Sequence, residues 1–121
     1  TLDKIELPDG WATRLNNNGN PRLSNGFISL DFIPLSNIRR LNEMRLQPTI
    51  ENFLLCTPLT VQSIVYDADE MEVHGDVGLY SLDHRIVKVN NLDEARFVAQ
   101  RRGVSLEQYV ASFGRSLQFK Y

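Results

Sequence analysis

The most regular pattern of apolar positions in this chain lies near its C-terminus. Between residues 106 and 117, apolar side chains recur at i, i+3, i+4, i+7 and i+11, which places them on one face of a helix. These residues are Leu106, Tyr109, Val110, Phe113 and Leu117. Ser105 precedes the run as an N-cap, and Gln108 completes a capping box. The pattern predicts an amphipathic helix with one buried face.

A second helix is predicted directly before this one, from Leu92 to residue 102. Gly103 follows it, and glycine readily adopts the left-handed conformation that ends a helix. The two helices are then joined by Gly-Val-Ser alone. The stretch 92–117 therefore predicts a helical hairpin.

The first third of the chain has the pattern of strands and turns. Residues 5–7, 11–15 and 27–33 alternate between apolar and polar side chains, which indicates strands. The segments between them are rich in Asn, Gly and Pro, the residues that tight turns favour. In the last segment Ile28, Leu30 and Phe32 share a face, so we expect a half-buried strand that ends at Pro34.

The middle of the chain is less regular. Ser36 is a suitable N-cap for a helix running to about Gln47, where Pro48 stops it. Residues 49–56 form an apolar run with helical spacing and a possible cap at Thr49. Periodicity alone leaves two alternatives for this run, a short buried helix or a core strand.

Further strands are predicted between this run and the C-terminal hairpin. Alternation indicates strands over 60–66, over 72–82 as one strand or a pair, and over 86–89, with an acidic turn at 67–70. The fold class is therefore α+β, with a mostly antiparallel sheet and the C-terminal amphipathic hairpin packed on one face. No repeat or linker divides the chain, so we expect a single domain over residues 1–121.

Composition adds few constraints. A chain of 121 residues with 42% hydrophobic and 23% charged residues is ordinary for a globular protein. No apolar run approaches the ~20 residues that span a bilayer, and no signal region or initiator Met begins the chain, so we expect a trimmed or mature product in the cytoplasm without a membrane partner. The single cysteine, Cys56, lies in an apolar run and is interpreted as a buried free thiol.

The charge is unevenly distributed. Residues 1–81 contain 11 Asp and Glu against 6 Lys and Arg, whereas residues 82–121 contain 4 against 7. An acidic body with a basic final third is compatible with weak nucleic-acid binding, and a difference of this size also arises by chance.

Six residues between 67 and 76 raise the question of a metal site. They are Asp67, Asp69, Glu70, Glu72, His74 and Asp76. Hard cations prefer carboxylate oxygens, but a calcium loop starting at Asp67 would need Gly at its sixth and Glu at its twelfth position, where this chain has Glu72 and Gly78. We therefore assign no metal ligands, no catalytic residues and no cofactor, and keep a small metal-dependent enzyme on this acidic hairpin as a second alternative.

Part of the chain resembles a known family. Val98-Ala99, Gly103, Ser105 and Val110 follow the pattern V-A-x-x-x-G-x-S-x-x-x-x-V. With the preceding strand pattern, residues 84–117 resemble the ribbon-helix-helix unit of small bacterial and phage repressors.

The resemblance implies a dimeric DNA-binding regulator. In that family a paired β-ribbon reads the DNA major groove, which implies base contacts from His84, Ile86 and Lys88. The phosphate contacts implied are Arg96, Arg101 and Arg102, with the helix N-terminus at Ser105.

The leading hypothesis from the residues themselves is a non-enzymatic binding or regulatory protein. It would act through protein–protein contact or self-association as a homodimer, with the C-terminal hairpin at the partner surface. Phe97, Phe119 and Tyr121 lie off the buried stripes or beyond the last helix, so they are candidates for an interface. Packing within the domain is the alternative for all three aromatic residues. DNA remains the alternative partner.

Overall fold

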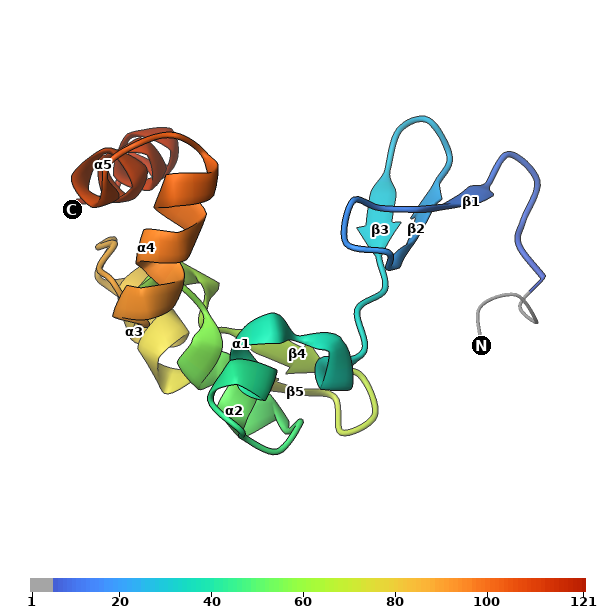
Figure 1. The fold of residues 1–121 in the computed structure, drawn as a ribbon, viewed down its shortest axis with the longest axis horizontal. Helices are drawn as coiled ribbons and strands as arrows, with labels where there is room; N and C mark the ends of the chain where they lie inside the picture. The colour runs from blue at the N-terminus through green and yellow to red at the C-terminus, as the bar shows by residue number, and fades with distance from the viewer. Residues whose placement is uncertain (1–5) are drawn as a thin grey trace. The chain divides into compact units, whose positions relative to one another are not determined.

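The computed structural model describes residues 6–121 and is drawn in Figure 1. The chain combines helices with antiparallel strands, which confirms the α+β class. Tertiary contacts divide it into two compact units, one that ends at Ile38 and one that spans Arg39–Tyr121. The single domain over residues 1–121 stays a prediction. The strand predicted over residues 5–7 begins at Ile5, outside the described residues.

The first unit contains a three-stranded antiparallel sheet in the order β1, β2, β3. Its strands are β1 (Ala12–Leu15), β2 (Pro21–Ser24) and β3 (Ser29–Asp31). Gly19 and Gly26 in the connecting turns have φ values of 79° and 90°, as the predicted Asn-Gly turns require. Leu23 of β2 is buried, whereas its register partner Leu30 is 46% exposed. The half-buried strand predicted over 27–33 is wrong in both length and burial, since β3 covers only Ser29–Asp31 and Ile28, Leu30 and Phe32 are all exposed.

The core of the second unit lies between the C-terminal helices and two extended segments. α4 (Leu92–Arg101) and α5 (Leu106–Leu117), orange and red in Figure 1, pack against each other and confirm the helical hairpin. The buried core residues come from both parts, and they are Leu59, Val87, Ala95, Ala99 and Tyr109. Isolated bridges join Leu59 to Val89 and Ile86 to Lys120. The hairpin thus packs on these extended segments.

The apolar stripe of α5 faces this core for most of its length. Tyr109 is buried with 1% exposure, and Leu106, Val110 and Phe113 are partly buried against the core cluster. Leu117 at the end of the helix is 42% exposed. The i, i+3, i+4 pattern therefore identified the buried face correctly up to its last position.

Both hairpin helices are capped, α5 by the predicted capping box and α4 by a residue that was not predicted as a cap. Ser105 Oγ accepts the N–H of Gln108 at 3.1 Å, and Gln108 Oε1 accepts the N–H of Ser105 at 2.9 Å. Asn91 caps α4 through the N–H of Glu94 at 2.9 Å. Gly103 has a φ of 68°, the left-handed conformation expected after the first helix.

The helix predicted over residues 36–47 has the wrong bounds. The chain forms a 3-10 turn, η2 (Leu35–Asn37), and then the short helix α1 (Arg39–Glu43). Arg45 has a φ of 55°, so the backbone turns left-handed two residues after the end of α1. A left-handed residue ends a helix by redirecting its last carbonyls, even where that residue is not glycine.

The next segments settle one alternative and correct one prediction. Residues 50–56 form a helix, α2 (Ile50–Cys56), with Thr49 as its N-cap. The strand predicted over 60–66 is instead a 3-10 turn, η3 (Thr60–Gln62), followed by the short strand β4 (Val65–Asp67).

The strand or strand pair predicted over 72–82 is wrong beyond His74. β5 (Glu72–His74) pairs with β4, so the strands form two separate antiparallel sheets. Gly75, with a φ of 120°, ends β5, and residues 76–83 form the helix α3 (Asp76–Asp83). Residues 86–89 contribute only isolated bridges. The longest helix among the described residues has 12 residues, and none has the length and apolarity to cross a bilayer.

Candidate protein-binding surface

Helix α3 packs on the rest of its unit through its small residues. Gly78 and Ser81 are the buried residues of this helix, which contacts η3. A Cβ added to Gly78 would lie 2.8 Å from the carbonyl carbon of Ser63 and 2.9 Å from Cβ of Ile64. Only glycine lets the helix approach the backbone this closely, because real Cβ atoms do not make contacts below 3.0 Å.

The large apolar residues of α3 point the other way. Val77, Leu79, Tyr80 and Leu82 are 47%, 42%, 59% and 43% exposed, respectively. We call these four residues the α3 face. A surface helix normally buries its apolar side chains and exposes its polar ones. α3 reverses this arrangement, which leaves four large apolar side chains exposed to water.

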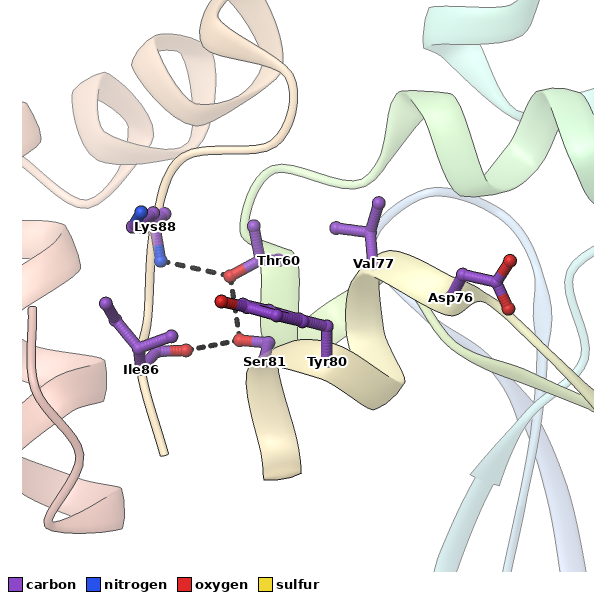
Figure 2. Close-up of a pocket in the computed structure, with 7 residues that line it drawn as sticks. All are labelled: Thr60, Asp76, Val77, Tyr80, Ser81, Ile86 and Lys88. Carbon is purple, nitrogen blue, oxygen red and sulfur yellow. Dashed lines mark hydrogen bonds between the residues drawn. The ribbon is translucent and has the colours of Figure 1, made fainter. Parts of the chain in front are cut away.

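A pocket of about 270 Å³ opens beside this face (Figure 2). It is lined by residues from α3, η3 and the extended segment after α3, namely Thr60, Asp76, Val77, Tyr80, Ser81, Ile86 and Lys88. The exposed lining is almost entirely carbon. A pocket of this kind accepts an apolar group.

A chain of hydrogen bonds holds the pocket together. The N–H of Lys88 donates to Thr60 Oγ1 at 3.0 Å, and Ser81 Oγ donates to the carbonyl of Ile86. The Thr60 and Ser81 hydroxyls lie 2.9 Å apart, and since Ser81 already donates to Ile86, Thr60 is the donor between them. The hydroxyl hydrogens are therefore used inside the protein and are not offered to a ligand.

Opposite charges stand at the two ends of the pocket. Figure 2 shows Asp76 at the start of α3 and Lys88 on the extended segment, with Val77 and Tyr80 between them. Both residues are exposed, and neither forms an ion pair with another described residue. The Tyr80 ring stacks on His84, with centroids 3.8 Å apart and an interplanar angle of 17°. This stack fixes one wall of the pocket.

The three residues predicted to bind a partner differ in exposure. Phe97 is partly buried beneath the guanidinium of Arg39, 3.6 Å from the ring centroid. Phe119 is partly buried against the core cluster. Tyr121 is 63% exposed, and its ring lies over Gly114. Of the three, Tyr121 is the one that presents most of its side chain to solvent.

The residues implied in base contacts do not lie together on one strand. His84 is the C-cap of α3, and Lys88 lines the pocket. Arg101 and Arg102 lie 5.8 Å and 5.2 Å from the ring centroids of Phe97 and Tyr109, respectively. Arg96 is exposed on α4, and Ser105 is engaged in the capping box.

The backbone after α3 is bonded within the chain. The N–H of Val87 donates to the carbonyl of Lys120 at 2.7 Å, and the N–H of Lys120 donates to the carbonyl of Arg85 at 2.9 Å. On the other side, the N–H of Thr60 donates to the carbonyl of Lys88 at 2.9 Å. A ribbon shared with a second chain would need such backbone groups.

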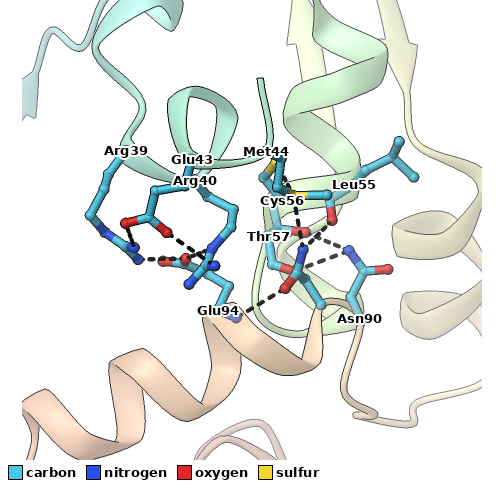
Figure 3. Close-up of polar contacts among 10 residues, drawn as sticks. Arg39, Arg40, Glu43, Met44, Leu55, Cys56, Thr57, Asn90 and Glu94 are labelled. Atoms are coloured by element: carbon cyan, nitrogen blue, oxygen red, sulfur yellow. Dashed lines mark hydrogen bonds and ion pairs between the residues drawn. The ribbon is translucent and has the colours of Figure 1, made fainter. Parts of the chain in front are cut away.

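A charged cluster ties α1 to α4 (Figure 3). Glu94 Oε2 accepts from Arg39 Nη2 and from Arg40 Nε, both at 2.8 Å, and Glu43 pairs with both arginines. The hydrogen bond with Glu94 raises the pKa of Arg40. The two guanidinium groups already have carboxylate partners, so this cluster is structural.

Two other candidates are placed by the structure. Cys56 is buried, as predicted, and burial raises the pKa of its thiol, which keeps it protonated and unreactive.

In the acidic turn Asp67 Oδ1 accepts the N–H groups of Asp69 and Glu70 at 3.0 and 3.3 Å. Within residues 6–121 no three His, Cys, Asp or Glu side chains form a group that fits a metal ion.

Comparisons with family models, with curated proteins and with solved structures found no match for this chain. The function is therefore argued from the site alone. Sequence reasoning named Lys88 and missed the α3 face, because residues 72–82 alternate like a strand. One signal in the sequence could have indicated this helix. Gly78 and Ser81 are small residues three positions apart, the spacing of neighbours on one face of a helix, and they follow Gly75-Asp76.

Proposed function

We propose that this chain is a non-enzymatic binding or regulatory protein that acts through protein–protein contact or self-association. Its partner surface is the α3 face with the adjoining pocket, and extends toward Tyr121 at the end of the C-terminal hairpin. The observation that carries the proposal is the reversed packing of α3, which buries Gly78 and Ser81 and exposes four large apolar side chains. Exposed apolar clusters of this kind are typical of protein interaction sites.

The predicted role of the hairpin is compatible with this surface. Ile86 lines the pocket and forms a parallel bridge with Lys120, the residue before Tyr121. The end of the hairpin is thus attached to a wall of the pocket. Tyrosine is among the residues enriched in interfaces, since its ring is apolar and its hydroxyl can remain hydrated.

Two alternatives receive less support. DNA binding through a dimeric ribbon stays a prediction, and the backbone of residues 85–88 is already bonded to Lys120 and Thr60 of the same chain. A metal-dependent enzyme on the acidic hairpin lacks a group of ligands among the described residues. A cytoplasmic location belongs to the proposal and is consistent with a single buried thiol.

Site-specific photo-cross-linking tests the proposed function. A photoreactive amino acid replaces Leu79 on the α3 face or, as a control, the exposed Glu107 on α5. We expect a discrete cross-linked product from position 79 and none from position 107 in cells that produce the full chain. Adding Val77→Asp should abolish the product. Val77 is exposed near the N-terminus of α3, where an acidic side chain favours the helix, so the fold should survive.

Products that are equal from both positions, or that persist with Val77→Asp, would overturn the proposal. Circular dichroism of the purified variants verifies that each is folded. The mass of the product identifies the partner class, since a second copy adds the mass of one chain and another protein adds a different mass.

A further inference from the structure

The charges around the pocket constrain what covers the α3 face. When two copies of one surface face each other across a two-fold axis, a residue on one side of the axis contacts the residue that lies on the opposite side in the other copy. Like charges at the two ends would repel in such a pair. Here one end carries Asp76 and the other Lys88, with Val77 and Tyr80 between them. The surface is therefore complementary to itself.

From this arrangement we infer that the α3 face binds a second copy of this chain, with the two-fold axis passing through the pocket. The inference rests on the function proposed above and names the partner. Asp76 of each copy pairs with Lys88 of the other, and the exposed Val77 and Tyr80 of the two copies pack together over the pockets. Both charged residues lack ion-pair partners among the described residues, so they are free to form these contacts.

The shape of the site agrees with this arrangement. Protruding apolar side chains and an apolar pocket lie on the same surface, so each copy supplies both the groups and the space that receives them. The Thr60 and Ser81 hydroxyls are bonded inside each chain, so closing the pocket leaves these donors satisfied. α3 is a single helix of eight residues, so we expect a small interface and a concentration-dependent dimer.

Charge exchange between the two positions provides a sharp test. The full chain is studied by sedimentation equilibrium over a range of concentrations, as the wild type and as the single variants Asp76→Lys and Lys88→Asp. Each variant places like charges in both contacts, and we expect its dimer dissociation constant to rise about tenfold or more. Glu107→Lys is the control, since it makes the same charge change at an exposed residue of α5 that does not line the pocket.

The two single variants should rescue each other. In a mixture, Asp76→Lys presents Lys at both positions and Lys88→Asp presents Asp at both, so every contact of the heterodimer joins opposite charges. We expect the mixture to dimerise with nearly the affinity of the wild type. The double variant D76K/K88D should also dimerise, because it reverses both charges in each copy.

Three results would overturn the inference. The wild type could be monomeric at every concentration, its dimer could be unaffected by Asp76→Lys and Lys88→Asp, or the mixture could fail to restore dimerisation. A monomeric wild type that still gives a cross-link from position 79 to another protein would leave the proposed function standing and remove only the second copy as the partner. Circular dichroism of each variant shows whether a loss of dimer reflects a loss of fold.

Discussion

Substitution of Gly78 by Ala tests whether α3 is held by its small residues. Alanine is the better helix former, so in an open helix the change would stabilise the protein by about 1 kcal/mol. At this position the new methyl group would lie 2.8 Å from the carbonyl carbon of Ser63 and 2.9 Å from Cβ of Ile64. The carbonyl carbon belongs to the backbone, so relief requires moving the whole helix.

The magnitude follows from these opposing effects. Forcing extra carbon into a well-packed site costs about 1–3 kcal/mol, and a contact below 3.0 Å with backbone belongs at the upper end. After subtracting the gain in helix propensity, we expect Gly78→Ala to reduce the free energy of unfolding by about 2 kcal/mol. Urea denaturation followed by circular dichroism measures this difference, with an unchanged m-value showing that the unfolding transition is the same.

Gly114→Ala is the matched control, since it makes the same change inside α5. There the added Cβ meets the ring of Tyr121, a side chain that is 63% exposed and can rotate into solvent. We expect this variant to lie within about 1 kcal/mol of the wild type. Equal stability of Gly78→Ala and the wild type, or a gain, would refute the close packing of α3 and with it the reason that its large residues face outward.

Three further predictions concern stability. Glu94→Gln leaves two guanidinium groups of α1 with one fewer carboxylate in a partly buried site and should lower the unfolding free energy by about 2 kcal/mol, measured by urea denaturation. Ser105→Ala removes the N-cap of α5 and should cost about 1 kcal/mol, whereas Ser112→Ala on the exposed side of the same helix should cost less than about 0.5 kcal/mol. The third prediction concerns Glu43, whose pKa is lowered from the ordinary value of 4.5 by its hydrogen bond with Arg39. This ion pair therefore stabilises the fold fully above pH 4.5, and its contribution is lost as the pH falls through the lowered pKa of Glu43. Thermal melts between pH 2 and 6 should therefore show a smaller acid-induced decrease in Tm for Glu43→Gln than for the wild type.

The C-terminal hairpin was predictable because its local and tertiary requirements agree. Tyr109 belongs to an apolar stripe with helical spacing, and the same stripe is what the core buries. Ser105 and Gln108 then define the start of the helix through backbone groups that every helix must satisfy. A segment can be predicted from a single sequence when its capping residues and its apolar pattern both indicate the same structure, as they do here.

Helix α3 was misread because its packing runs against the usual pattern. Helical periodicity indicates a helix when the apolar residues are buried, whereas in α3 Gly78 and Ser81 are buried and Leu79 and Tyr80 are exposed. A helix that buries small residues has no buried apolar stripe from which periodicity could identify it. The exposure of the large apolar residues of α3 both makes this surface a candidate site and explains why the apolar pattern did not reveal it.

A helix end without glycine was the other source of error. α1 is followed by the left-handed residue Arg45, with a φ of 55°. Such residues carry no compositional signal, since the left-handed conformation is imposed by the surrounding structure at a modest cost. The helix predicted to extend to residue 47 therefore stops at Glu43.

The bridge between Ile86 and Lys120 has a consequence for synthesis on the ribosome. Val87 and Arg85 exchange backbone hydrogen bonds with Lys120, a residue 33 positions or more further along the chain. Chains emerge N-terminal end first, so the segment beside the pocket remains without this partner until residue 120 has left the exit tunnel. The wall that Ile86 gives to the pocket is therefore completed only after both hairpin helices have emerged, which delays assembly of the binding surface relative to α3 itself.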